Sequence, residues 1–258
     1  MKAEKIEFII NNNNIQTLIS KLADITKISD NIRIKIDPEN ILIYGLVGEA
    51  AILAFKSHLL NTIDFLDTKN EFNFCLDFVL LGAKKFTKNL GFFEYKEKTK
   101  LVIQYKDNPD MEDVKNVRAM TIQDTQLKIA TIGDQPNRLR DINKNVLAQK
   151  FDPKLSNWQF SLNKDALDRI KKISNNSDEK IISASIREGE VFFSEGSKWS
   201  LLVGKTEHKE IIEINFDNSY LSNIIPQNDN IDFYVFDSTI LFKETDRTNL
   251  LVSFEQIA

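Results

Sequence analysis

The feature that most constrains this chain is an order of elements that occurs twice, about 150 residues apart. Residues 14–28 place apolar side chains at the spacing of one helix face, and residues 31–36 alternate apolar and polar side chains like a half-buried strand. A turn at residues 37–40 then leads into a second strand. Residues 161–193 repeat this order, with a turn at Glu188–Gly189. The chain is therefore expected to fold as two similar units.

Each half also contains a second predicted helix. Apolar spacing places it over residues 76–90, ending before Gly91, and over residues 218–225, where Pro226 stops it. The remaining segments are short strand-like runs separated by turns. Short strands in succession favour antiparallel sheets over βαβ winding. The predicted class is α+β, with two similar units that each combine antiparallel sheets with two helices.

The segment between the halves, residues 134–157, has the composition of a linker. It contains two prolines, several basic residues and few apolar ones. Linkers longer than about 15 residues in compact proteins are usually functional or disordered. We therefore predict a first domain over residues 1–133, a connector over 134–157 and a second domain over 158–258.

Composition leaves little room for catalytic chemistry. With one cysteine, Cys75, and two histidines, His58 and His208, the chain cannot form an internal disulfide and lacks the ligands of a His/Cys zinc site. A catalytic triad would have to use one of these histidines, which fall at a strand end and in a polar loop. The run Val203–Thr206 resembles the end of a phosphate-binding loop but lacks its first glycine. We expect no enzyme, no metal and no cofactor. An active site of carboxylates gathered in a cleft stays an open alternative.

The N-terminus predicts a cytoplasmic protein. Glu4 and Glu7 interrupt the basic-then-apolar order of a signal peptide. No apolar run approaches the roughly 18 residues of a membrane span, so we expect no membrane partner.

Charge is distributed unevenly along the chain. The three long predicted helices (residues 14–29, 76–90 and 161–174) carry nine basic residues and four acidic ones, whereas the whole chain has a net charge of −4. A basic helical surface on an acidic protein attracts a phosphate backbone without reading bases. The alternative is that these lysines are ordinary solvated positions on helices.

The duplication, the connector and the charge distribution together resemble the DNA sliding clamps of the trimeric kind, the architecture shared by PCNA and the clamps of large bacteriophages. Residues 158–167 and 182–191 resemble the opening strand, inner helix and first hairpin of a clamp domain. The compact second half favours the bacteriophage type, which would place the protein in the host cytoplasm. The resemblance implies a ring-forming clamp fold, and rings of this family contain six such units, so a two-unit chain needs three copies.

The resemblance also implies a function. Three copies would close around double-stranded DNA without regard to its sequence, tether the replicative DNA polymerase and so confer processivity, without catalysis. The implied partners are duplex DNA, a DNA polymerase, an ATP-driven clamp loader and the chain itself. The helices would line the hole, although the predicted helix at 218–225 carries no Lys or Arg. The nine basic residues expected to face DNA are Lys21, Lys27, Lys84, Lys85, Lys88, Lys164, Arg169, Lys171 and Lys172.

Two strands and part of the connector complete the implied sites. Subunits would pair head to tail through the last strand of the first half and a strand of the second half. If these strands were interior strands of one sheet, this pairing would be impossible, and that alternative stays open. The interface residues are Lys128, Ile129, Ala130, Thr131 and Ile132 on one strand and Trp199, Ser200, Leu201, Leu202 and Val203 on the other. Partner proteins are expected at the connector, at Arg138, Leu139 and Arg140.

Two further functions fit the same sequence. A monomeric processivity factor shares the double fold and binds DNA on an open basic face. A viral structural or interaction module would assemble duplicated domains without binding DNA at all. Solution mass and salt-dependent DNA binding distinguish the three.

Overall fold

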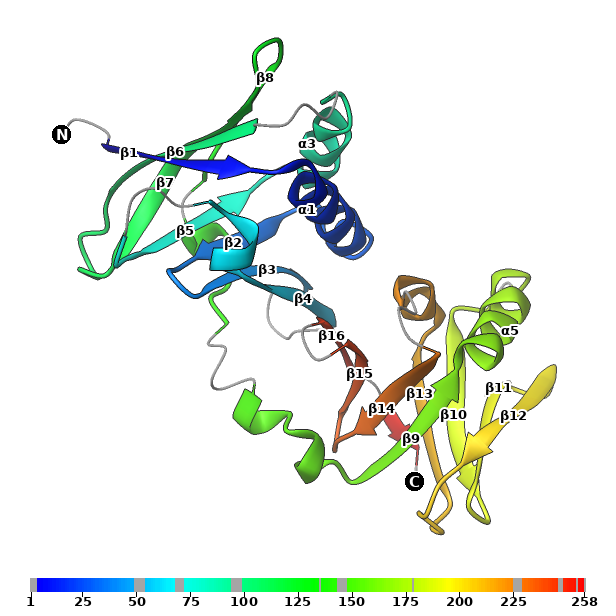
Figure 1. The fold of residues 1–258 in the computed structure, drawn as a ribbon. Coiled ribbons are helices and arrows are strands. Elements are labelled where there is room, and N and C mark those ends of the chain that lie inside the picture. The colour runs from blue at the N-terminus through cyan, green and yellow to red at the C-terminus, as the bar shows by residue number, and fades with distance from the viewer. Residues whose placement is uncertain are drawn as a thin grey trace. The chain divides into compact units, whose positions relative to one another are not determined.

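Figure 1 shows the computed structural model of the chain, which describes residues 4–48, 54–67, 72–93, 99–134, 136–142, 148–177, 179–224, 229–245, 248–253 and 255–257. The chain divides into two compact units. Unit 1 consists of Met1–Leu46 and Ser57–Asp141, and unit 2 of Val47–Lys56 and Ile142–Ala258. Strand β4 (Ala54–Asn61) therefore contributes to both units.

Unit 1 is a mostly antiparallel sheet with two helices on one face. The strand order is β1-β6-β7-β5-β2-β3-β4, and β8 pairs with the far end of β7. Only the pairing of β5 with β7 is parallel among those described here. Its elements are β1 (Glu4–Ile10), α1 (Asn12–Ile25), β2 (Ile32–Ile36), β3 (Asn40–Val47), β4 (Ala54–Asn61), α2 (Thr62–Phe65), β5 (Cys75–Leu80), α3 (Ala83–Leu90), β6 (Thr99–Asp107), β7 (Val114–Gln123), β8 (Lys128–Ile132) and the 3₁₀ turn η1 (Pro136–Arg138).

The core of unit 1 lies between this sheet and its helices. Helix α1 buries Ile15, Leu18 and Leu22, as the spacing predicts, and the Asn11 side chain caps it by accepting a bond from the Asn14 amide. Helices α1 and α3 lie side by side (Figure 1). This places their polar faces together on the same side of the sheet.

Unit 2 consists of two antiparallel sheets. One has the order β16-β15-β14-β9 and the other β12-β11-β10-β13-β17. Its elements are η2 (Pro153–Leu155), β9 (Trp158–Asn163), α5 (Lys164–Asn175), β10 (Ile181–Arg187), β11 (Glu190–Glu195), β12 (Trp199–Lys205), β13 (Ile212–Asp217), η3 (Asn218–Asn223), β14 (Asn230–Val235), β15 (Thr239–Thr245), β16 (Thr248–Ser253) and β17 (Glu255–Ile257).

Phenylalanines join the two sheets of unit 2. Phe160 of β9 stacks on Phe233 of β14 at 4.6 Å between ring centroids, and Phe193 of β11 contacts both rings edge-on. The predicted turn at Glu188–Gly189 closes the β10–β11 hairpin, with both residues at positive φ. This is the geometry that a two-residue hairpin requires.

The predicted α+β class is confirmed, and the order of elements in unit 2 repeats that of unit 1. The helix predicted over residues 76–90 is wrong in its first half, which forms strand β5, and the helix begins only at Ala83. The apolar periodicity of a short strand that is buried on both faces cannot be distinguished from that of a buried helix. Gly82, at a φ of 66°, separates the two elements.

The other helix boundaries also differ from the prediction. Helix α1 spans residues 12–25 instead of 14–29. Residues 161–163 belong to β9, and Asn163 caps α5 through the Ala166 amide, so this helix begins at Lys164. The predicted helix at 218–225 is a 3₁₀ turn that ends at Asn223. No helix in the described part of the chain is long and apolar enough to cross a membrane.

Candidate functional site

Strand β8 is the edge of its sheet. Among the described residues it pairs only with β7, with Ile132 opposite Ala119. Ile129 packs inward, while Lys128 and Ala130 are exposed and Thr131 is half-buried. Ile132 is 81% exposed. A strand edge of this kind offers unpaired backbone groups and apolar surface to another strand.

Strand β12 is also an edge. It pairs with β11, and no second strand pairs with it in the described part of the chain. Leu202 is 50% exposed, Ser200 is exposed, and Leu201 and Val203 are half-buried. Trp199 is held by a hydrogen bond from its Nε1 to Glu195 Oε2 at 2.9 Å. The two strands predicted to join subunits are therefore edge strands, and the alternative that they are interior is wrong.

A groove of about 550 Å³ runs between β12 and helix α5. Its helical wall carries both signs of charge, and its sheet wall is apolar. The lining residues are Asn163, Asp165, Ala166, Asp168, Arg169 and Lys172 from the helical side, and Leu201, Leu202 and Val203 from β12.

The basic residues predicted to face DNA lie mostly on exposed helical surface. Lys84, Lys85 and Lys88 are exposed on α3, and Lys164, Arg169 and Lys172 on α5. The corrected helix boundaries remove one residue of each sign from the count, Lys27 and Asp77, so the excess of basic charge on the helices is unchanged.

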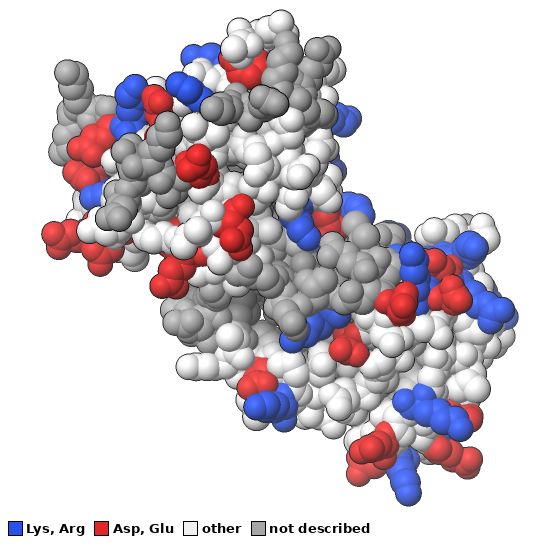
Figure 2. All heavy atoms as spheres, viewed as in Figure 1, with Lys and Arg blue, Asp and Glu red and all other residues white. Residues whose placement is uncertain are grey.

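Three of the nine basic residues predicted to face DNA are less accessible to a ligand. Lys27 lies beyond the end of α1, with Nζ 3.6 Å from Asp24 Oδ1. Lys21 is half-buried. Lys171 is half-buried and donates to the Ile224 carbonyl, which ties α5 to the segment after η3. Figure 2 shows Lys and Arg beside Asp and Glu on the visible surface of both units.

The three residues predicted to bind partners divide into two kinds. Arg138 and Arg140 are exposed, and Arg138 lies 3.4 Å from Asp134. Leu139 between them is buried, and its carbonyl accepts a hydrogen bond from Arg33 at 2.9 Å. Leu139 therefore anchors this segment, and the arginines are the residues that a partner can reach.

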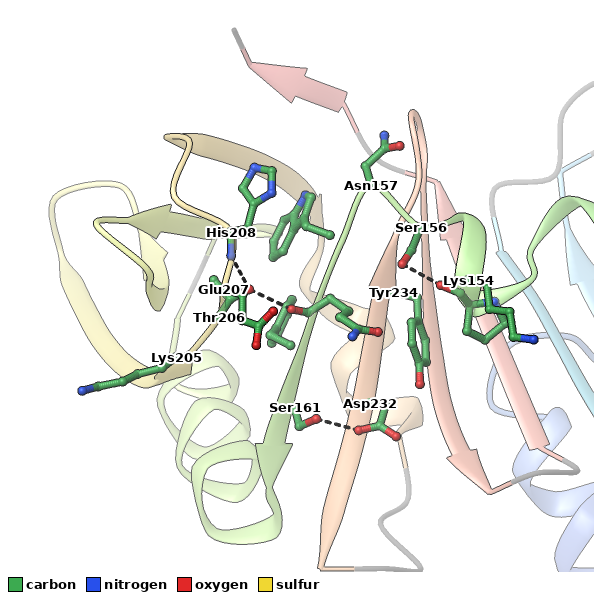
Figure 3. Close-up of a pocket in the computed structure, with 14 residues that line it drawn as sticks. Lys154, Ser156, Asn157, Ser161, Lys205, Thr206, Glu207, His208, Asp232 and Tyr234 are labelled. Atoms are coloured by element: carbon green, nitrogen blue, oxygen red, sulfur yellow. Dashed lines mark hydrogen bonds between the residues drawn. The ribbon is translucent and has the colours of Figure 1, made fainter.

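A polar pocket of about 900 Å³ lies in unit 2 beside the end of the predicted connector (Figure 3). Its sides are η2, residues of β9 and β14, and the segment from Lys205 to His208. Thr206 Oγ1 donates to the Gln159 carbonyl at 3.0 Å, and Ser161 donates to Asp232 at 2.6 Å. The pattern of the sequence did not predict this pocket, because its walls come from segments about 80 residues apart.

No group with the character of a catalyst emerges among the described residues. His58 is buried against Asp24, with Nε2 2.9 Å from Oδ2. Burial raises the pKa of the Cys75 thiol to about 12, with the neighbouring Asp77 charge adding to the effect. The thiol therefore stays protonated at neutral pH and is a poor nucleophile. No cluster of three or more metal-ligating side chains occurs in the part of the chain that the structure describes.

Comparison with solved structures identifies the architecture. The fold covers 97% of this chain and 100% of PCNA from Thermococcus kodakaraensis, with a TM-score of 0.65 and 14% identity. A chain of the PCNA2–PCNA3 complex from Sulfolobus tokodaii matches over 98% of this chain and 99% of its own length, with a TM-score of 0.62 and 11% identity. The chain has the sliding-clamp fold.

A bacterial clamp chain with a similar fold is longer than this chain. The Helicobacter pylori beta clamp bound to a DNA ligase peptide matches 98% of this chain but only 66% of its own length, with a TM-score of 0.65 and 10% identity. This chain thus corresponds to two thirds of a bacterial clamp chain and to a whole PCNA chain. No protein-family model matches the sequence, and no curated protein matches it.

Proposed function

We propose that this chain is the subunit of a sliding clamp, a ring of three copies that encircles duplex DNA and holds a DNA polymerase on it. The observation that carries the proposal is the pair of open edges, β8 in unit 1 and β12 in unit 2, in a chain with the clamp fold. An edge on each unit allows head-to-tail pairing, which closes into a ring when the rotation is right.

We base the proposed number of copies on the lengths of these chains. This chain spans 66% of a bacterial beta clamp chain and all of a PCNA chain. It therefore supplies two units, and a ring of six units needs three chains. Because its structural neighbours are clamps, we assign to this chain a non-catalytic role, as a replication protein of the cytoplasm.

Processivity arises from topology in this mechanism. A closed ring leaves DNA only by opening, so phosphate contacts need not be tight. Exposed lysines on α3 and α5 suit this role because their contacts with phosphates are mobile and independent of sequence. Ring opening for assembly on DNA requires an ATP-driven loader, and the exposed Arg138 and Arg140 are the proposed contacts for the loader and the polymerase.

Solution mass tests the proposal directly. Light scattering on a gel-filtration peak, over a dilution series, is expected to give about 89 kDa, three times the chain mass of 29.7 kDa. A mass near 29.7 kDa at every concentration would contradict the ring. Binding of that monomer to duplex DNA at low salt would indicate the monomeric processivity factor, and its absence a structural module.

A further inference from the structure

The first observation is a pair of cations on the side of the unit 1 sheet that faces away from α1 and α3. In β2, Ile32, Ile34 and Ile36 pack into the core. Alternate residues of a strand point to opposite faces, so Arg33 and Lys35 point the other way. Arg33 is nonetheless only 4% exposed. A buried guanidinium has to be paired or its desolvation is very costly.

Asp77 of β5 pairs with Arg33. Arg33 Nε donates to Asp77 Oδ1 at 2.8 Å, and Nη2 donates to Oδ2 at 2.6 Å, which is the two-pronged geometry of a strong ion pair. Burial opposes the charged form of Arg33, but the Asp77 carboxylate outweighs it and raises the pKa of the guanidinium above its ordinary value. Asp77 Oδ2 also lies 4.0 Å from Lys35 Nζ, but one carboxylate cannot neutralise both cations.

The segment after η1 supplies a further acceptor for Arg33 and a carboxylate for Lys35. Arg33 Nη1 donates to the Leu139 carbonyl at 2.9 Å, and Lys35 Nζ donates to Asp141 Oδ1 at 2.6 Å. The hydroxyl of Tyr44, on β3, lies 3.4 Å from the Arg140 carbonyl. Three consecutive residues of the connector are thus attached to one sheet face.

The charges of this site lower the pKa of Asp141. Burial acts to raise its pKa, but the hydrogen bond from Lys35 and the charges of Arg33 and Lys35 outweigh it, so the pKa of Asp141 lies below its ordinary value. Its side chain is still 50% exposed. The Lys35–Asp141 pair is therefore the accessible part of the site, and the Arg33–Asp77 pair is the buried part.

Unit 2 provides an internal comparison. Strand β10 lies between β11 and β13 as β2 lies between β3 and β5, and it shows the same alternation, but Ser183 and Ser185 occupy the positions that correspond to Arg33 and Lys35. The duplicated fold therefore forms without cations at these positions. Their presence in unit 1 needs another reason, and the attached connector segment provides one.

We propose that Arg33, Lys35 and Asp77 form a binding site for residues 139–141, which latches the start of the connector to unit 1 and holds Arg138 and Arg140 outward. The site recognises a carboxylate and a backbone carbonyl two residues apart. The latch itself is independent of the ring. Its consequence, that partners meet two arginines in fixed positions, rests on the proposed function.

Trypsin provides the test because it cuts after arginine, and cleavage within a docked segment requires local opening. In the intact protein, cleavage after Arg138 and Arg140 is expected to be slow. The substitution Lys35→Met removes the bond to Asp141 and is expected to raise the initial cleavage rate after Arg140 about tenfold, since a charged hydrogen bond contributes roughly that factor to local opening. Mass spectrometry of early fragments measures the rate at each site.

Matched variants separate the latch from general unfolding. Lys100→Met removes an exposed lysine of the same unit, which lies 3.9 Å from Glu7, and is expected to leave the rate unchanged. Lys35→Arg keeps a donor and is expected to restore protection. Asp141→Asn, a change at a half-exposed position, is expected to accelerate cleavage as Lys35→Met does while the urea midpoint stays near that of the intact protein.

Two results would overturn the proposal. One is equal cleavage of the intact protein and both latch variants after Arg140. The other is acceleration at tryptic sites throughout the chain, which would show global unfolding. Neither result depends on ring formation. A monomer whose connector is protected from trypsin would contradict the ring and support the latch. A ring whose connector is not protected would support the ring and contradict the latch.

Discussion

At the scale of single residues, the buried charges of unit 1 distinguish it from unit 2. Arg33 and Asp77 are both 4% exposed and bond to each other twice, so neither can lose its partner without leaving an unpaired charge in a dry environment. Surface pairs such as Lys115–Asp107, at 2.8 Å with the Asp107 side chain 65% exposed, are different because water can reach the group that remains.

Asp77→Ala tests this difference. Removing one partner of a buried pair costs about 3–5 kcal/mol, so the variant is expected to lose most of the stability of unit 1. Asp107→Ala removes the same group from an exposed pair and is expected to cost at most about 1 kcal/mol. Urea denaturation followed by circular dichroism measures both. Equal, small losses would mean that the Arg33 site is not desolvated as the structure indicates.

The sequence predicts single residues of this site poorly. Arg33 and Asp77 are 44 residues apart, and Lys35 and Asp141 are 106 apart. Asp77 was assigned to a helix, where it would not lie opposite Lys35; only as a strand residue does it occupy that register. A charged pair formed across strands depends on register, which one sequence does not reveal without knowledge of strand order.

At the scale of elements, the length of a helix or strand determines whether its apolar spacing identifies it. Helices α1 and α5 were found because their apolar spacing persists over 12 residues or more. Strand β5 was misassigned because six buried residues fit either period. The two edge strands were located correctly along the chain, but their edge position comes only from the sheet order, in which each has a single partner among the described residues.

Substitutions in the edge strands test their role. Ile132→Asp places a charge on an 81% exposed side chain of β8, where it cannot disturb the core. If β8 pairs with another subunit, this charge becomes buried in the interface, and the mass is expected to fall from about 89 kDa towards the chain mass of 29.7 kDa. Leu202→Asp on β12 is expected to do the same.

Each edge variant has a control of the same kind. Ile63→Asp lies on α2 in unit 1 and is 76% exposed, and Ile211→Asp lies outside the strands of unit 2 and is 82% exposed. Both are expected to keep the assembled mass. Assembly that survives Ile132→Asp and Leu202→Asp together would show that other surfaces join the copies.

At the scale of the whole molecule, the duplication accounts for the fold and for the proposed assembly. Two similar units give one chain edge strands of different sequence, among them β8 and β12, and pairing of two such different edges between copies is head to tail instead of face to face. The net charge of −4 then has to be reconciled with the proposed binding to DNA. An acidic ring can surround DNA only if its basic residues face inward, which is the arrangement that the lysines of α3 and α5 make possible.

The triple variant Lys84→Glu, Lys85→Glu, Lys88→Glu tests this arrangement, since all three lysines are exposed on α3 and no acidic residue shares that helix. It changes the charge of each chain by −6, and of a ring of three by −18, on the proposed inner surface. Binding to duplex DNA at low salt, measured by fluorescence anisotropy, is expected to weaken at least a hundredfold, with a shallower salt dependence because fewer counterions are released. The assembled mass is expected to stay the same.

A triple variant of strand lysines, Lys5→Glu, Lys100→Glu, Lys106→Glu, makes the same charge change outside the helices and is expected to weaken binding far less. If the two variants lose affinity equally, net charge governs binding, and α3 does not face the DNA.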